Sequence, residues 1–242
     1  GLGDVYKRQE CDNMNKIPYR YDIVGSFLRS ERLKHARENF NNNLISKNEL
    51  KKIENEEILK LVKKEEAAGL KAVSDGEFRR SYWHLDFLAG LTGVKKIEAE
   101  KWSVDFKGVQ PKAATLKIID KIDFEDHEFL EHFEYLNSII ENGVTAKMTI
   151  PAPTMLHLIA CVRTKEYQPI ARYQDDEQLI VDLAMAYQKI IQAFYDRGCR
   201  YLQLDDTSWG EFCSKEKREE YANCGIDVGA LVKKYVYLIN LS

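Results

Sequence analysis

Four short apolar segments of the chain each run into glycine, proline or acidic residues, and stretches with helical character separate them. These segments are residues 21–26, 71–74, 145–150 and 199–204. Apolar runs of this length that are bounded by turn residues are typical of β-strands. Because strands that alternate with helices usually pair in parallel, the chain is predicted to be an α/β protein built on a parallel sheet.

Two of the separating stretches have the periodicity of amphipathic helices. Residues 50–65 and 179–194 each place apolar side chains three or four positions apart. Gly69 and Gly198 follow these stretches and are expected to end the helices.

The pattern is looser over residues 79–143. Aromatic side chains in this region, Trp102 among them, precede an acidic and aromatic helix that we expect around residues 124–142. A connection of this length is more typical of a functional insertion than of a plain loop.

The length of 242 residues suits a single α/β barrel, so one domain is expected over residues 10–242. Residues 1–9, GLGDVYKRQ, resemble a non-native leader and are excluded from the fold. Residues 231–239 have helical apolar spacing, and the chain stops soon after them, at Ser242, without a capping residue. We therefore expect a chain that is truncated at its C-terminus.

Composition and charge favour small-molecule ligands. The net charge is -3 and the basic residues form no stripe, whereas binding to a nucleic-acid backbone needs clustered Lys and Arg. The sequence contains no apolar run of about 18 residues, so neither a membrane span nor a membrane partner is predicted, and a cytoplasmic location is expected. Five cysteines without a CxxC pair fit reduced thiols.

Polar residues at the strand ends point to the site. In a (β/α)8 barrel the chemistry lies at the carboxyl ends of the strands, and doubly wound sheets obey the same rule. The four predicted strands are half of the set that closes such a barrel, and their ends carry Ser26, Glu77, Pro151 and Asp205.

Glu77 and Asp205 are the candidate pair of carboxylates at this rim. Such a pair can exchange protons, bind an ammonium group or hold a metal ion. The alternative is that each carboxylate caps the turn or helix after its strand, as Asp does readily. Spacing leaves both interpretations open, while Asp75 and Gly76 form a common turn pair.

Other side chains near the predicted rim also have two interpretations each. Arg79 and Arg80 suit an anionic group of a ligand, or they are solvated surface residues. His84 either faces a pocket or covers the core. Trp209 either stacks on a flat heterocycle or packs against its neighbours.

Motifs for metals and nucleotides are missing from the sequence. His157 and Cys161 are four positions apart and share a predicted helix face, but their apolar neighbours favour a core position over metal binding. The sequence contains no GxGxxG, Walker A or GxSxG motif, which disfavours mononucleotide-binding loops and serine hydrolases.

Four motifs occur in order along the chain: DIVGSFLRSERL at 22–33, EEAAGLKAVSDGEFRRSYW at 65–83, AKMTIPAPTML at 146–156 and YLQLDDTSWGEF at 201–212. Together they resemble the catalytic barrel of the cobalamin-independent methionine synthase family, and in particular its short stand-alone members. The resemblance covers residues 16–242. It implies a TIM barrel of the methionine synthase/uroporphyrinogen decarboxylase type, incomplete in this chain, with about the first half of the strands and a long insertion.

The resemblance implies a methyltransferase that moves a methyl group from methyltetrahydrofolate to the thiol of homocysteine. It implies that Ser26 holds the carboxylate of this amino acid and that Glu77 and Asp205 bind its amino group. In the family a zinc ion holds the thiol as a thiolate, and its His-x-Cys, Glu and Cys ligands would lie beyond Ser242. The 242-residue chain is therefore expected to keep much of the homocysteine site, to lack the zinc site and to transfer no methyl group.

Two departures from the family leave the substrates open. The strand-end Asp-Glu-Pro triplet of the family reads Asp205-Asp206-Thr207 here, and Leu28 stands where a proline often follows Gly-Ser-Phe. The methyl donor is then a folate, a corrinoid protein or another small methyl carrier. Two rival functions remain, a decarboxylase of the uroporphyrinogen type and a barrel that binds an amino acid without turnover.

Overall fold

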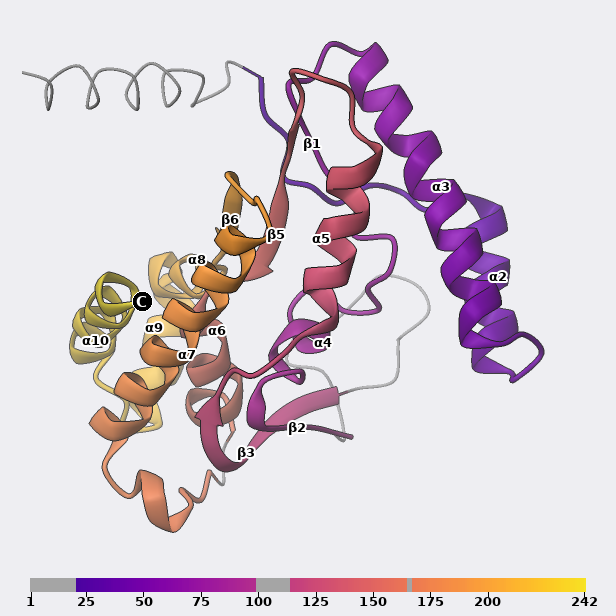
Figure 1. Ribbon diagram of the computed structural model, residues 1–242. Coiled ribbons are helices and arrows are strands. Elements are labelled where there is room, and N and C mark those ends of the chain that lie inside the picture. Colours follow the sequence, from indigo (N-terminus) through magenta and orange to yellow (C-terminus); the bar gives the residue numbers. More distant parts are fainter. Residues whose placement is uncertain (1–20, 99–113, 165–166) are drawn as a thin grey trace, which may run out of the picture. The chain divides into compact units, whose positions relative to one another are not determined.

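The computed structural model of the protein describes residues 21–98, 114–164 and 167–242 (Figure 1). These residues form two compact units. Unit 1 contains residues 21–78 and 136–147, and unit 2 contains the rest of the described residues. The single domain expected from the chain length stays a prediction.

Unit 1 begins with two helices that lie side by side (Figure 1), α2 (Glu31–Asn41) and α3 (Lys47–Ala67). Serine hydroxyl groups cap the first turn of both helices. The helix predicted over residues 50–65 is confirmed in α3, which ends shortly before Gly69 as expected. Its buried face includes Ile58, which is completely shielded from solvent.

The strands of unit 1 are short. β1 (Ala72–Val73) pairs in parallel with β4 (Thr145–Ala146). The N–H of Lys147 continues the ladder by donating to the carbonyl oxygen of Val73 at 2.8 Å. The parallel pairing predicted for residues 71–74 is therefore confirmed.

The strand predicted over residues 21–26 is wrong, because this segment belongs to no sheet of the described residues. Side chains take the place of the missing ladder. The ammonium group of Lys147 lies 3.0 Å from both carboxylate oxygens of Asp22 and donates to the carbonyl oxygen of Ile23. A carbonyl bonded in this way is satisfied without a neighbouring strand. The leader expected at residues 1–9 lies outside the described residues.

Unit 2 contains the second parallel pair, β5 (Met148–Pro151) and β6 (Leu202–Asp205). Their register runs from Met148 opposite Leu202 to Pro151 opposite Asp205. The pair confirms strands in the regions predicted at residues 145–150 and 199–204.

One boundary differs from the prediction. The strand predicted over residues 145–150 is divided at Lys147, and its second part includes Pro151. Proline was expected to stop the strand because it has no N–H for a ladder. The ladder bond to β6 at this position is made by the N–H of Ala152, which donates to the carbonyl oxygen of Asp205 at 2.8 Å, so the missing N–H of Pro151 removes no bond between β5 and β6.

Helices make up most of the rest of unit 2. The helix predicted over residues 179–194 is confirmed as α7 (Asp176–Asp196), and the one predicted over residues 231–239 as α10 (Val228–Leu241). None of the helices within the described residues has both the length and the apolar character that crossing a membrane requires. The other helical elements are α4 (Leu85–Leu88), α6 (Pro153–His157), the π-helix η1 (Leu158–Val162), the 3-10 helix η2 (Ala171–Tyr173), α8 (Ser208–Cys213) and α9 (Lys215–Asn223).

The predicted insertion over residues 79–143 contains a two-stranded antiparallel sheet (Figure 1), formed by β2 (Thr92–Glu98) and β3 (Ala114–Asp123). Sequence patterns did not indicate these strands. The helix α5 (Glu128–Ile139) follows, which confirms the helix expected around residues 124–142.

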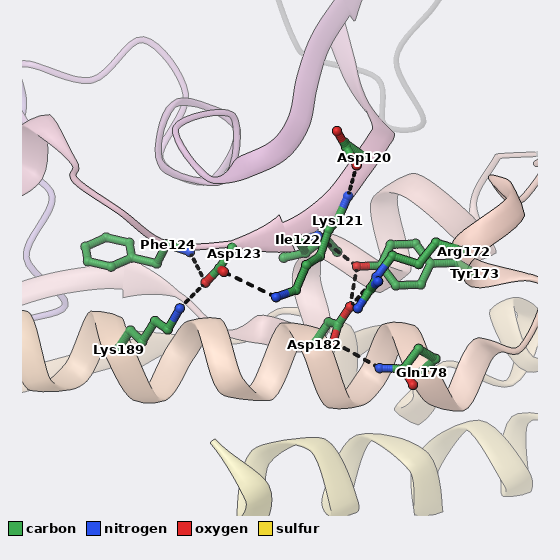
Figure 2. A network of polar contacts seen from close by, with 10 residues as sticks. All are labelled: Asp120, Lys121, Ile122, Asp123, Phe124, Arg172, Tyr173, Gln178, Asp182 and Lys189. Atoms are coloured by element: carbon green, nitrogen blue, oxygen red, sulfur yellow. Dashed lines mark hydrogen bonds and ion pairs between the residues drawn. The ribbon is translucent and has the colours of Figure 1, made fainter.

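A buried carboxylate connects β3 to α7 (Figure 2). Asp182 of α7 accepts hydrogen bonds from the Tyr173 hydroxyl at 2.9 Å, the Arg172 guanidinium at 2.8 Å and the Gln178 amide at 3.0 Å. The Tyr173 hydroxyl in turn accepts from the main-chain N–H of Ile122 in β3 at 2.8 Å. Both carboxylate oxygens of Asp182 and the Tyr173 hydroxyl have hydrogen-bond partners. The network therefore fixes β3 against α7 without leaving these buried polar groups unsatisfied.

We expect Gly93→Ala to destabilise the protein more than Gly143→Ala does. Gly93 has a φ of 79° at the bulge of β2, and a Cβ atom there would lie 2.3 Å from the carbonyl oxygen of Lys121. Gly143 has a φ of 85°, but its Cβ would meet nothing within 4 Å. Both variants incur a left-handed cost of about 1–2 kcal/mol, and overpacking adds about 1–3 kcal/mol at Gly93. Urea unfolding measures both losses, and equal losses would contradict this steric argument.

Candidate functional site

The turn that follows β1 is held by its own side chains. The Ser74 hydroxyl accepts from the N–H of Gly76 at 3.1 Å and donates to the carbonyl oxygen of Gly25 at 2.6 Å. The Asp75 carboxylate accepts from the N–H of Glu77 at 2.9 Å, as in an Asx turn. Asp75 therefore has the turn role predicted for it.

Glu77 occupies this turn with a left-handed backbone. Its φ is 57°, and its exposed fraction is 8%. The preceding Gly76 has a φ of 65°, and a Cβ atom there would lie 2.4 Å from the side chain of Leu61. Non-glycine residues in this region are uncommon, cost energy and cluster at functional sites. Backbone strain at an acidic residue therefore marks Glu77 as a functional candidate.

Ser26 lies beside the same turn, and both of its neighbours bond to it. The N–H of Phe27 donates to the carbonyl oxygen of Gly76 at 3.1 Å, and the carbonyl oxygen of Gly25 accepts a hydrogen bond from the hydroxyl of Ser74. Ser26 itself is exposed. Of the predicted site residues, Ser26 and Glu77 are thus brought together within unit 1.

Glu65 of α3 supports this turn from within the unit. Its side chain is buried, and one carboxyl oxygen accepts from the N–H of Ser74 at 3.2 Å. The other oxygen is buried and bonds to none of the described residues. Burial raises the pKa of Glu65 to about 8, against the opposing effect of the Ser74 N–H. At neutral pH Glu65 is therefore mostly a neutral carboxylic acid.

Arg80 is buried and Arg79 is half-buried, so neither is the solvated surface residue that one of the two interpretations expected. Arg80 is 3% exposed and donates to the carbonyl oxygen of Thr149 at 2.6 Å and to its hydroxyl at 3.1 Å. Its guanidinium lies 4.8 Å from the ring centroid of Phe129, and that of Arg79 lies 5.2 Å from the ring centroid of Tyr135. A contact of either arginine with an anionic ligand stays a prediction.

His84 and Trp209 are half-buried in unit 2. The His84 ring centroid lies 4.6 Å from that of Trp83, and burial lowers the pKa of His84 to about 4, so the imidazole is neutral at pH ~7. Trp209 packs edge to face with Phe212 at 5.9 Å between ring centroids, which agrees with the packing interpretation. Contacts of these side chains with a methyl donor stay predictions, and Trp102 lies outside the described residues.

The end of β6 carries two adjacent carboxylates with different partners. Asp205 is half-buried and accepts from the Gln203 amide at 2.6 Å. Asp206 accepts from the Thr154 hydroxyl at 2.7 Å and from the N–H of Ser208 at 2.9 Å, where α8 begins. Asp206 therefore bonds to the turn that leads into α8, whose N-cap residue is Thr207. Asp205 lies in unit 2, and its pairing with the carboxylate of unit 1 stays a prediction.

His157 has the core position that its apolar neighbours predicted. It is buried, and its ring nitrogens lie 3.0 Å from the Asp176 carboxylate and 3.1 Å from the Tyr235 hydroxyl. Within residues 21–98, 114–164 and 167–242, His, Cys, Asp and Glu gather in no group of three that could hold a metal ion. The described residues therefore offer no set of ligands for a zinc ion, and zinc in the whole protein stays a prediction.

Three supporting residues were missed by sequence reasoning: Glu65, Lys147 and Arg29, whose guanidinium donates to the carbonyl oxygen of Glu77 at 2.8 Å. Lys147 is a charge inside a predicted buried strand, which is a usable signal because an unpaired buried charge is too costly to persist. Glu65 and Arg29 occur in ordinary polar surroundings in the sequence, and no pattern distinguishes them.

Comparisons with known proteins identify relatives of this chain. The family model described as "Cobalamin-independent synthase, Catalytic domain" matches residues 21–233. The uncharacterized protein YxjG of Bacillus subtilis is 43% identical over 233 residues, 96% of this chain and 60% of YxjG. Methionine synthase of Saccharolobus solfataricus is 23% identical over 208 residues, 81% of this chain and 58% of that protein. The chain thus spans about 60% of the length of these relatives.

A solved structure from Listeria monocytogenes shows a similar α/β fold. Its name assigns it provisionally to the vitamin-B12 independent methionine synthases. The two chains are 45% identical in sequence and superpose with a TM-score of 0.75. The match covers 93% of this chain and 60% of the Listeria chain. Whether the barrel is incomplete in this chain stays a prediction.

The pKa of Glu65 makes the stability of the fold depend on pH. Its pKa is about 8 in the folded chain against an ordinary value of 4.5, so between these values folding takes up a proton. The contribution of Glu65 to the free energy of unfolding is therefore fully present below pH 4.5, its ordinary pKa. It is lost as the pH rises through the folded-state pKa of about 8. For one proton the slope is about 1.4 kcal/mol per pH unit.

We expect Glu65→Gln to flatten this decline, because the amide keeps the shape of the neutral acid and does not ionise. Urea unfolding of both proteins between about pH 5 and 9 measures the slopes. Parallel slopes would show that Glu65 is already ionised in the folded chain at neutral pH.

Proposed function

The chain belongs to the family of cobalamin-independent synthase catalytic domains, and we propose that the whole protein is a methyltransferase that methylates the thiol of homocysteine to form methionine. The methyl donor in this proposal is methyltetrahydrofolate or another methyl carrier. The methionine synthase names of a relative and of a solved structure support the proposal.

The buried, left-handed Glu77 beside Ser26 is the observation that carries the proposal. A carboxylate binds an ammonium group through strong charge-assisted hydrogen bonds, and exclusion of water strengthens them. In the proposed complex Glu77 binds the amino group of homocysteine and Ser26 binds its carboxylate. Asp205 supplies a second carboxylate for the amino group.

The methyl donor is proposed to bind near the residues that follow the turn. Arg79 and Arg80 supply positive charge for an anionic donor, and Arg80 is already oriented by Thr149. The neutral ring of His84 and the indole of Trp209 offer hydrogen bonding and stacking to a heterocycle.

The reaction forms a bond between sulfur and the methyl carbon, breaks the bond between that carbon and the donor, and releases the thiol proton. A free thiol with a pKa of ~8.5 is mostly protonated at neutral pH, although the thiolate is the nucleophile. The amino-acid clamp fixes where the sulfur lies. A zinc ion that would stabilise the thiolate is proposed for the whole protein only, because the described residues offer no group of metal ligands.

We expect Glu77→Ala to weaken the binding of L-homocysteine to the chain by about 10- to 100-fold, because a hydrogen bond to a charged group is lost. Isothermal titration calorimetry under reducing conditions measures the Kd. Glu141→Ala is the control, since Glu141 is an exposed acid of the same unit that pairs with Lys63. Unchanged affinity in Glu77→Ala would mean that Glu77 is a turn residue and not a ligand-binding one.

We expect the 242-residue chain to form no methionine from homocysteine and methyltetrahydrofolate with added zinc. The reason is that its described residues supply no group of ligands for the metal that activates the thiol. Methionine synthase of Saccharolobus solfataricus, assayed under the same conditions, is the comparison protein. Methionine formed by the chain at a similar rate would overturn this expectation.

A further inference from the structure

Two guanidinium groups hold consecutive carbonyl oxygens of the strained turn. Arg29 donates to the carbonyl oxygen of Glu77 at 2.8 Å, and Arg37 donates to that of Phe78 at 3.1 Å. On the other side of the turn, Asp75 accepts from the N–H of Glu77 at 2.9 Å. Asp75 and Arg29 therefore bond to the two peptide groups that flank the Cα atom of Glu77, and Arg37 bonds to the next peptide group along the chain.

Arg37 is itself held in place. Arg37 lies on α2 and also donates to the Glu54 carboxylate of α3 at 3.1 Å, and their side chains are only 20% and 9% exposed. Arg29 lies just before Ser30, the N-cap of α2. A guanidinium presents its donors in a rigid fork, so one bond to a carboxylate leaves other donors aimed at a carbonyl oxygen.

A left-handed glutamate needs such support. The intrinsic preference of any residue other than glycine opposes this conformation, so it persists only where surrounding contacts determine it. The orientation of the peptide groups on both sides of a Cα atom sets the direction of its bond to Cβ. If Glu77 relaxed to a right-handed or extended backbone, its carboxylate would point in another direction.

We propose that Arg29 and Arg37 are positioning residues that hold Glu77 in its left-handed conformation and so aim its carboxylate at the ammonium group of the amino-acid substrate. This inference rests on the proposed role of Glu77 in substrate binding. It adds that the binding energy of the carboxylate depends on two cations that bond to the main chain of the turn.

If Arg37 only held α2 against α3, its loss would affect the binding of homocysteine no more than the loss of another ion pair between these helices. Arg32 also lies on α2 and pairs with Glu56 and Glu57 of α3, at 2.5 and 2.9 Å. Both arginines thus pair α2 with α3, although Arg32 is 47% exposed and Arg37 20%, and of the two only Arg37 also bonds to the turn within the described residues. Arg32→Met is therefore the matched control for the loss of a helix–helix ion pair.

The experiment measures the Kd of L-homocysteine by calorimetry for the chain with Arg29→Met, Arg37→Met, Arg37→Lys or Arg32→Met, with thermal unfolding of each. We expect Arg29→Met and Arg37→Met to raise the Kd by about tenfold each and Arg32→Met to change it less than about twofold. We expect Arg37→Lys to recover part of the affinity, because one charged donor remains.

A double-mutant cycle with Glu77→Ala tests whether the arginines act through Glu77. In the Glu77→Ala background, Arg37→Met is expected to have no further effect on the Kd. If both changes weaken binding independently, or if Arg32→Met weakens it as much as Arg37→Met, the positioning role is wrong. If Glu77→Ala alone leaves the Kd unchanged, the proposed function of Glu77 fails instead.

Loss of folding would not hide the answer. Glu54→Gln removes the carboxylate partner of Arg37 without removing the guanidinium, so the bond to the carbonyl oxygen of Phe78 can remain. We expect this variant to lower the midpoint of thermal unfolding and to keep the Kd within about twofold. A large rise in its Kd would show that the affinity follows the packing of α2 on α3 and would overturn the proposal.

Discussion

Buried carbonyl oxygens that no strand can satisfy determine the architecture around the candidate site. The segment before α2 and the turn after β1 have main-chain groups that a sheet ladder does not reach, and side chains bond several of their carbonyl oxygens. Ser74 takes the carbonyl oxygen of Gly25, Lys147 that of Ile23 and Arg29 that of Glu77. An unsatisfied buried carbonyl costs about as much as a lost hydrogen bond, so these side chains are as necessary to the local fold as a strand would be.

The sequence predicted the elements whose stability is local. α3 and α7 have strong apolar periodicity and capping residues, and both occur where they were expected. β2 and β3 escaped prediction because TGVKKIE and ATLKIIDKID together contain as many charged as apolar residues, which hides the apolar pattern of a strand. The segment at residues 21–26 has the composition of a strand, but composition does not reveal which donor will satisfy its carbonyl oxygens.

The same division applies to the site. The position of an acid directly after a strand was enough to single out Glu77, and it also drew attention to Asp205. Sequence could not separate the acid that holds the turn after the strand from its neighbour, and in the structure Asp206 bonds to that turn. The left-handed backbone of Glu77 and the neutral state of Glu65 both arise from tertiary burial, for which spacing along the chain holds no information.

The attachment of β3 to α7 has a consequence for how the protein can vary among its relatives. Tyr173 recognises Ile122 through the main-chain N–H and not through the side chain. Every residue except proline presents that donor, so the attachment itself places almost no restriction on the amino acid at this position. Ile122 itself is buried in the core, so this freedom applies to the exposed positions of β2 and β3, whose side chains can change while Tyr173 and Asp182 retain the attachment to α7.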